Sequence, residues 1–161
     1  MIRALLMISL VACSGAPGGP TMSNSMSGGP EATAQSSSVV TADILAREAQ
    51  ANATGVKHIL ISWKKATDDG HADPRAAKRT KQDAEEQVRA LVTQLKAGAD
   101  FDVLMKQWSE DPGSASSGHV YAVAPDAQLV IEFKQLGLRL RVGEIGVVES
   151  DFGFHIMKRV E

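Results

Sequence analysis

From residue 56 onward, the positions of apolar side chains predict a series of short strands and helices. Residues 56–62 form an apolar run rich in β-branched side chains, which is typical of a buried strand. Residues 63–79 are polar and contain Gly70 and Pro74, so we predict a long loop there. Residues 119–123, 145–150 and 154–160 have the character of three further strands, and in the last of them Phe154, Ile156 and Val160 alternate with polar residues.

Helical spacing occurs in three stretches between these strands. The first opens at Thr80 and Asp83 with a capping-box pattern and stops at Gly98. Asp100 is predicted to cap the second helix, and Asp126 the third, while residues 109–118 are predicted to form a turn-rich loop. The order β-α-α-β-α-β-β over residues 56–161 predicts a single α+β domain. We expect a small, mostly antiparallel four-stranded sheet with about three helices.

The start of the chain has a different pattern. One positive charge at Arg3 precedes an apolar run that ends at Ala12. This run is too short to cross a bilayer, which takes about 20 residues. It is typical of a signal peptide, which we predict over residues 1–12. The alternative is a short apolar N-terminus followed by an incidental cysteine, Cys13.

Residues 13–55 are predicted to be a flexible tether. Gly, Pro, Ser, Ala, Thr and Met dominate its first part, which offers too little apolar surface to offset the entropy of ordering. Its r.m.s. reach would be on the order of 35 Å. Residues 42–51 contain good helix formers, so a short helix is expected within the tether.

Charge and cysteine content narrow the function classes. The formal charge of −2 does not favour nucleic acid as a partner. With one cysteine, no disulfide can form within the chain. No short His/Glu spacing points to a metal, so neither a metal nor a cofactor is expected. Separately, nothing in the sequence favours an oligomer, so we expect a monomer.

Two resemblances add to this picture. The run ending Leu10-Val11-Ala12-Cys13 resembles the lipobox of bacterial lipoproteins, which implies lipidation of Cys13. Residues 56–161 resemble the parvulin family of prolyl isomerases. Six motifs carry that resemblance in the right order: His58-Ile59-Leu60, Gly98-Ala99-Asp100-Phe101, Ser109-Glu110-Asp111-Pro112-Gly113, Glu132-Phe133, Gly143-Glu144, and Ser150-Asp151-Phe152-Gly153-Phe154-His155.

One stretch departs from the family pattern. Parvulins usually have Gly-Gly-Asp-Leu-Gly after the acidic loop, whereas residues 117–123 here read Ser-Gly-His-Val-Tyr-Ala-Val. Residues 146–150 are also one residue short. Both changes affect the expected shape of the pocket.

The parvulin resemblance implies a peptidyl-prolyl cis-trans isomerase site. It places His58 and His155 together on neighbouring strands, bonded to Ser150, with Asp111 beside the rotating bond. The proline pocket would be formed by Val120, Leu129, Phe133 and Phe152. Purely structural roles for the two histidines, and a turn-capping role for Asp111, remain the alternatives.

The predicted loop 63–79 carries several cations near the expected pocket entrance. An anion-binding role toward an acidic residue before proline is one hypothesis, and an ordinary solvated loop is the other. The residues concerned are Lys64, Lys65, Arg75, Lys78 and Arg79.

Taken together, the two resemblances imply a lipid-anchored isomerase of a bacterial cell envelope. Its location would be the outer membrane, facing the periplasm, because Ser14 follows the lipidated cysteine. Its partners would be unfolded or extended proline-containing polypeptides and, through the anchor, the membrane. The competing hypothesis is a catalytically weak parvulin domain that binds extended segments as a chaperone.

Overall fold

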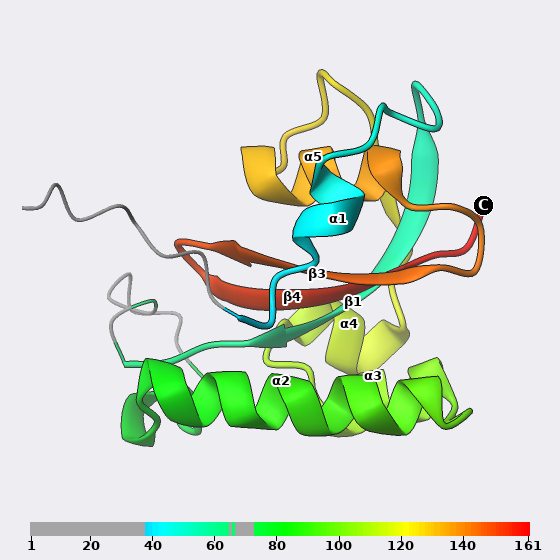
Figure 1. Ribbon diagram of the computed structural model, residues 1–161. Helices are drawn as coiled ribbons and strands as arrows, with labels where there is room; N and C mark the ends of the chain where they lie inside the picture. Colours follow the sequence, from blue (N-terminus) through cyan, green and yellow to red (C-terminus); the bar gives the residue numbers. More distant parts are fainter. Residues whose placement is uncertain (1–37, 65, 67–72) are drawn as a thin grey trace, which may run out of the picture. The chain divides into compact units, whose positions relative to one another are not determined.

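The computed structural model describes residues 38–64, 66 and 73–161, and these form an α+β fold (Figure 1). The predicted signal peptide, Cys13, Lys65 and His71 lie outside the described residues. The elements are α1 (Ala42–Leu45), β1 (Thr54–Ile61), the 3₁₀ helix η1 (Ala76–Lys78), α2 (Lys81–Lys96), α3 (Phe101–Trp108), α4 (Pro112–Ser117), β2 (Tyr121–Val123), α5 (Ile131–Arg139), β3 (Ile145–Ser150) and β4 (Gly153–Arg159).

The four strands form one sheet in the order β2-β1-β4-β3, and every neighbouring pair is antiparallel. This confirms the predicted fold class and strand count. Helices α2, α3 and α4 lie on one side of the sheet, and α1 and α5 lie on the other (Figure 1). Since successive side chains of a strand point to opposite faces, each face has its own core.

The core between the sheet and α2 is apolar. Buried side chains of β1, β3 and β4 meet those of α2 and α3 there, namely Ile59, Ile61, Val147, Phe154, Ile156, Ala84, Val88, Leu91, Leu95, Phe101, Leu104 and Met105. The opposite core joins the sheet to α1 and α5 through Ile44, Val56, Val123, Phe133, Leu136, Leu140, Val148 and Met157.

Two of the predicted helix starts are confirmed. Thr80 and Asp83 form a reciprocal capping box at the start of α2, and the Asp100 side chain accepts from the Val103 N–H at the start of α3. Both caps satisfy backbone donors that have no partner within the helix. The sequence therefore specified these two boundaries locally.

Two local predictions are wrong. The expected loop 109–118 contains helix α4, because Asp111 caps it and Pro112 occupies its first turn, a favourable pairing despite the serines that follow. Helix α5 is not capped by Asp126 but begins at Ile131. Before it the chain forms tight turns, in which the Ala127 N–H donates to the Ala124 carbonyl.

Residues 38–55 differ from the prediction of a tether. Ile44 is buried against the α5 face, and Thr41 bonds Val147 of β3 through its backbone and its side chain. The helix expected over residues 42–51 ends at Leu45. A helix this short is marginal by itself, and the residues after it bond to α5 instead, as in the 2.7 Å bond from the Gln50 N–H to the Leu138 carbonyl.

No helix in the described part of the chain is both long enough and apolar enough to cross a bilayer. Within that same part, no group of three or more His, Cys, Asp or Glu residues has the geometry to hold a metal ion.

Candidate active site

Two histidines meet on the α5 face of the sheet. In the antiparallel register, His58 of β1 lies opposite Met157, and His155 of β4 lies opposite Leu60. The two histidines are thus diagonal neighbours on one face. Their Nδ1 atoms are 3.2 Å apart, and both residues are buried.

A serine at the end of β3 continues this contact. The Ser150 Oγ lies 2.7 Å from His155 Nε2, and it also accepts the Phe152 N–H at 3.2 Å. The sharp turn between β3 and β4 brings Ser150 there, and Gly153 permits the turn with a φ of 137°. A side chain at Gly153 would meet the Ile61 carbonyl oxygen at 2.6 Å.

An aspartate completes the row of polar groups. Asp111 Oδ2 is 3.5 Å from His58 Nε2, and it accepts hydrogen bonds of 2.7 Å from the Ser114 N–H and from the Tyr121 hydroxyl. Asp111 is therefore both the cap of α4 and the neighbour of a site histidine. Asp111 thus has the capping role that was one of the alternatives, and the cap also holds its carboxylate in place.

The edge of β1 positions this aspartate. Beyond its short pairing with β2, β1 is bordered by the segment that leads to Asp111. The Glu110 N–H donates to the Leu60 carbonyl at 2.9 Å, the Leu60 N–H donates to Ser109 Oγ at 3.1 Å, and the Ser62 N–H donates to a Glu110 carboxylate oxygen at 2.7 Å. The acidic loop is thus tied to the strand that carries His58.

One proton arrangement satisfies every partner in the row. A carboxylate only accepts, so His58 Nε2–H is assigned toward Asp111, which leaves His58 Nδ1 to accept from His155 Nδ1–H. His155 Nε2 then accepts from the Ser150 hydroxyl. Both rings are neutral in this arrangement, and the row runs from Ser150 to Asp111 without an unpaired group.

Burial and these contacts shift three pKa values. Burial first, and the neighbouring His58 ring second, lower the pKa of His155 to about 3, which keeps it neutral. Burial alone would raise the pKa of Asp111, but hydrogen bonds from His58, Tyr121 and Ser114 lower it well below its usual range. Burial, helped by Asp111, raises the pKa of Tyr121 to about 12.

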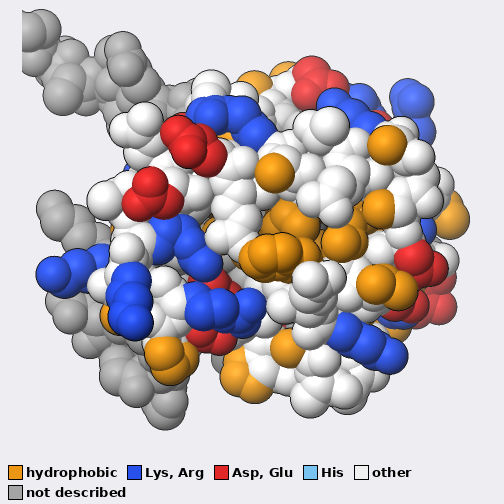
Figure 2. Space-filling view, turned by 90° about the horizontal axis from the view of Figure 1, so that it is seen from below, with side chains coloured by type: hydrophobic (Ala, Val, Ile, Leu, Met, Phe, Trp, Pro, Cys, Tyr) orange, Lys and Arg blue, Asp and Glu red, His pale blue; other side chains and the backbone are white. Residues whose placement is uncertain are grey.

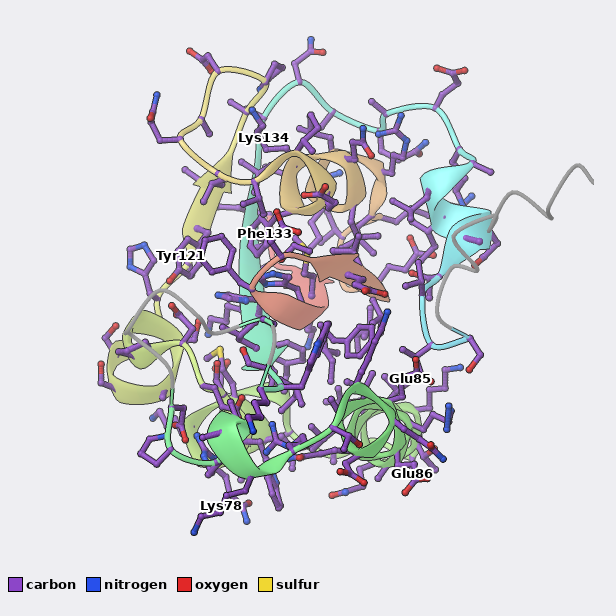
Figure 3. The ribbon with its side chains drawn as sticks, turned by 90° about the vertical axis from the view of Figure 1, so that its left-hand side faces the viewer. Lys78, Glu85, Glu86, Tyr121, Phe133 and Lys134 are labelled. Atoms are coloured by element: carbon purple, nitrogen blue, oxygen red, sulfur yellow. The ribbon has the colours of Figure 1, made fainter. Side chains whose placement is uncertain are left out.

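Aromatic rings enclose the histidine pair. Phe133 of α5 stands edge-on to His58 and His155, with ring centroids 5.0 and 5.4 Å away, and Tyr121 of β2 stands edge-on to His58 at 4.9 Å. Tyr121 and Phe133 reach into the same region from β2 and α5 (Figure 3). Aromatic side chains therefore border the row of polar groups.

The other predicted wall residues lie at different depths. Phe133 is buried, and Leu129 is half-buried against the α5 core. Val120 and Phe152 are 38% and 45% exposed, respectively. Val120 directly precedes Tyr121 in the sequence, and Phe152 follows Ser150 by two positions.

The predicted anion-binding cations are largely paired with groups of the protein. Arg79 donates to the Glu110 carboxylate and to the Ser62 carbonyl, each at 2.7 Å, and Arg75 pairs with Asp73 at 2.8 Å. Lys and Arg side chains gather over η1 and the start of α2, with acidic groups among them (Figure 2). Lys64 and Lys78 are exposed there. The geometry makes Arg79 a structural residue that fixes the acidic loop.

Sequence reasoning missed Tyr121 as a member of the site. It is the single tyrosine of the chain, and it lies in the stretch that departs from the parvulin pattern. No local signal links it to Asp111, which is ten residues away on another element. His119 is exposed, and its ring stands edge-on to Tyr121 at 4.5 Å.

Comparisons with known proteins assign the chain to a family. The model of the PPIC-type PPIASE domain matches residues 42–161. Foldase protein PrsA of Geobacillus kaustophilus is 37% identical over 75 residues, which are 46% of this chain and 27% of that protein. Chaperone SurA of Nitrosospira multiformis is 34% identical over 107 residues, 66% of this chain and 22% of that protein. The chain thus spans about a quarter of the length of these relatives.

Solved structures share the fold. A crystal structure of peptidylprolyl isomerase PrsA from Bacillus cereus matches with a TM-score of 0.51 and 28% identity, covering 68% of this chain and 35% of that one. Peptidyl-prolyl isomerase ESS1 from Candida albicans matches with a TM-score of 0.58 at 20% identity, covering 68% and 63% of the two chains, which supports the fold alone. From its site, its fold and the family match, this chain belongs to the PpiC-type peptidyl-prolyl cis-trans isomerase (PPIase) family, the parvulins.

Proposed function

We propose that this chain is a peptidyl-prolyl cis-trans isomerase that accelerates rotation about X–Pro bonds in extended polypeptides. The observation that carries the proposal is the buried contact of 3.2 Å between His58 and His155, continued by Ser150 and Asp111. Uncatalysed X–Pro isomerisation takes tens to hundreds of seconds, so a folding chain gains from such a catalyst.

The site would act without a covalent step. The barrier comes from resonance in the planar amide, so a site that binds the twisted amide better than either planar form lowers it. Apolar walls suit the proline ring, which lacks a hydrogen-bond donor. We assign these walls to Phe133, Leu129, Val120 and Phe152, together with Tyr121.

Asp111 would supply the electrostatic part. Its carboxylate stays ionised at neutral pH because the hydrogen bonds that it accepts lower its pKa. A negative charge beside the substrate carbonyl disfavours the charge-separated planar amide, in which that oxygen is most negative, and so favours the twisted form. His58, His155 and Ser150 act as positioning residues that hold this carboxylate and the pocket floor.

Exchange NMR on X–Pro tetrapeptides tests the proposal with the wild-type chain and His58→Ala. We expect acceleration by the wild type and a loss of about tenfold or more in the variant, because the floor beneath the ring is removed. Circular dichroism and thermal unfolding serve as controls for folding. Absence of acceleration by a folded wild type would overturn the proposal.

We also propose that residues 1–12 are a signal peptide and that a lipid on Cys13 anchors the domain to the cell envelope through residues 14–37. The lipobox-like sequence supports this, and the outer membrane facing the periplasm is the proposed site. The test is the partition of Cys13→Ser and wild type in detergent phase separation. A variant that still enters the detergent phase fully would contradict the anchor.

A second candidate function is a peptide-binding chaperone with little turnover. The specific observation is Tyr121, which covers Asp111 in the stretch where the parvulin pattern is lost. Relatives with the printed names Foldase protein PrsA and Chaperone SurA are compatible with it. Binding of X–Pro peptides without acceleration, unchanged in His155→Ala, would favour this function over the first.

A further inference from the structure

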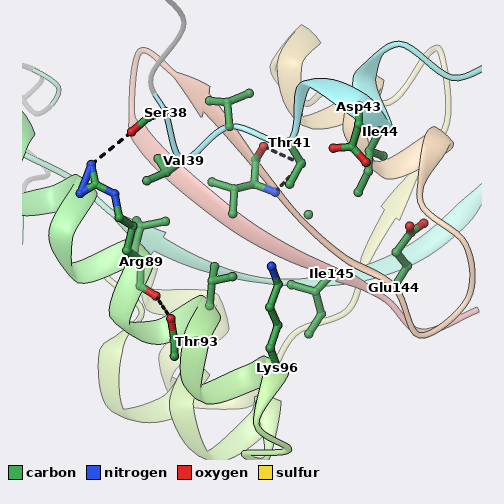
Figure 4. Close-up of a pocket in the computed structure, with 15 residues that line it drawn as sticks. Ser38, Val39, Thr41, Asp43, Ile44, Arg89, Thr93, Lys96, Glu144 and Ile145 are labelled. Atoms are coloured by element: carbon green, nitrogen blue, oxygen red, sulfur yellow. Dashed lines mark hydrogen bonds between the residues drawn. The ribbon is translucent and has the colours of Figure 1, made fainter.

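A cavity lies away from the histidine pair, between helix α2, strand β3 and the segment before β1 (Figure 4). Its volume is about 550 Å³. Its lining mixes polar and apolar groups in similar proportion, and no residue of the candidate active site takes part. The residues that line it include Val88, Val92, Lys96, Thr41, Ile145 and Val147.

The sheet edge at this cavity is only partly covered. β3 is an edge strand, and Thr41 covers it at one position, where the Thr41 N–H donates to the Val147 carbonyl at 3.0 Å and Thr41 Oγ1 accepts the Val147 N–H at 2.9 Å. Backbone groups of an edge strand alternate in direction, so Ile145, two residues earlier, presents its N–H and carbonyl to the same edge. Among the described residues, none forms hydrogen bonds with the Ile145 backbone at this edge in the way that Thr41 does with Val147.

One cation at the cavity makes no ion pair within the described part of the chain, although the cavity as a whole is not positively charged, because Asp43 and Glu144 share the single cation Arg47. The acidic rim groups Asp43 and Glu144 are both paired with Arg47, at 3.3 and 2.7 Å. Arg89 pairs with Glu85 at 3.0 Å. Lys96, in the last turn of α2, points its ammonium group into the cavity and has no ion-pair partner among the described residues (Figure 4).

We propose that this cavity is a docking site for an extended polypeptide segment that carries apolar side chains and a carboxylate. The segment would pair its backbone with the open edge at Ile145 by β-strand addition. Its apolar side chains would contact Val88, Val92 and Ile145, and its carboxylate would meet Lys96. A client held at this site keeps its flanking residues near the domain, where an X–Pro bond can enter the active site.

The test uses a probe without proline, the peptide acetyl-Val-Thr-Val-Glu-Val-amide, so that binding does not depend on the proposed isomerase function. It is titrated into the ¹⁵N-labelled full-length chain carrying Cys13→Ser. We expect saturable shifts of the amides of Thr93, Lys96 and Ile145. Shifts confined to His58, Tyr121 and Phe133, or no shifts in the millimolar range, would overturn the proposal.

Two substitutions locate the site. Lys96→Met keeps the length of the side chain and removes the charge, so the Kd should rise about threefold, which is ordinary for one exposed ion pair. A peptide with Gln in place of Glu should bind the wild type about threefold more weakly than the Glu peptide does. The Lys96→Met variant should bind the Gln and Glu peptides with equal Kd. Lys106→Met on α3 is the matched control and should not change the Kd.

Filling the cavity is the stronger variant. Thr93 is exposed at the rim, so Thr93→Trp adds bulk without disturbing the core, and binding should fall more than tenfold. Unchanged binding in both Lys96→Met and Thr93→Trp would refute the proposal. Occupation of the cavity by the chain's own residues 1–37, seen as shifts of their amides when the peptide is added, would also refute it.

Discussion

The two faces of the sheet are built from the same four strands but are filled in different ways. The face toward α2 holds aliphatic and aromatic side chains, and Ile59, Phe154 and Ile156 there are fully buried. The face toward α5 has a comparable apolar core, but it also buries His58, His155 and Ser150 at its centre. The first face contributes stability through burial alone, and the second combines burial with a defined polar arrangement.

The comparison shows where a site can be placed at low cost in stability. Burying a polar group without a partner is expensive, and the α5 face avoids this because each ring nitrogen and hydroxyl in the row has a partner. The α2 face tolerates changes of volume badly and carries no chemistry. Mutations on the two faces should therefore separate stability from activity.

The largest effect is expected from a cavity in the α2 face. Ile156→Ala should reduce the free energy of unfolding by about 2–5 kcal/mol, because a fully buried side chain is truncated. Urea unfolding measures this. Isomerase activity per folded molecule should stay within about twofold, since Ile156 points away from the histidines. The control Val103→Ala, at an exposed position of α3, should cost less than about 0.5 kcal/mol.

The second effect is a pH dependence that belongs to the α5 face. The pKa of His155 is lowered to about 3 in the folded chain, whereas an unfolded histidine titrates near 6.5, so between these values the unfolded state binds the extra proton. The free energy of unfolding should therefore fall by about 1.4 kcal/mol per pH unit as the pH drops from 6 to 4.

Substitution isolates the contribution of this histidine. Urea unfolding at several pH values measures how the free energy of unfolding changes with pH. For His155→Asn this slope should be smaller than the wild-type slope, by the amount that corresponds to about one bound proton. His119→Asn, at an exposed position, is the control and should keep the wild-type slope. Equal slopes in all three proteins would mean that His155 does not remain neutral in the folded state.

The third effect concerns charge at the site. Asp111→Asn keeps a good helix cap but removes the carboxylate, so we expect kcat/KM to fall about thirtyfold, which corresponds to about 2 kcal/mol. Asp100→Asn makes the same change at the cap of α3, away from the site, and should leave kcat/KM unaltered. If both variants lose activity equally, capping rather than charge would explain the loss.

The smallest effect is expected at Tyr121. Tyr121→Phe removes one hydrogen bond to Asp111 and keeps the ring against His58, so stability should fall by about 1 kcal/mol and kcat/KM by a few-fold. As the single tyrosine, its phenol can be titrated by absorbance, with an expected pKa of about 12. In Asp111→Asn that pKa should decrease, while the part due to burial should remain.

Much of the fold could be predicted from local sequence signals. The capping box at Thr80, the cap at Asp100 and the strand at residues 145–150 depend on neighbours within a few positions, so they were predicted correctly. Helix α4 was missed because its cap and proline had to be weighed against three serines and a glycine. The segment 38–55 was missed because its order comes from long-range contacts with β3 and α5.

The candidate site divides in the same way. The histidines and Asp111 were predicted as site residues from motifs, and the register of β1 and β4 brings the two histidines together. Tyr121 and the pairing of Arg79 with Glu110 could not be found, because each joins elements that are far apart along the chain.

The sequence by itself determined the strands and most of the longer helices, and which residue types are available for chemistry. Periodicity and caps are local, so they can be read without knowing the fold. Only the tertiary structure decided which polar groups share a bond, which cations are neutralised and where an open sheet edge meets a cavity. These depend on register and packing between distant segments, where one position of slip would turn His58 to the other face.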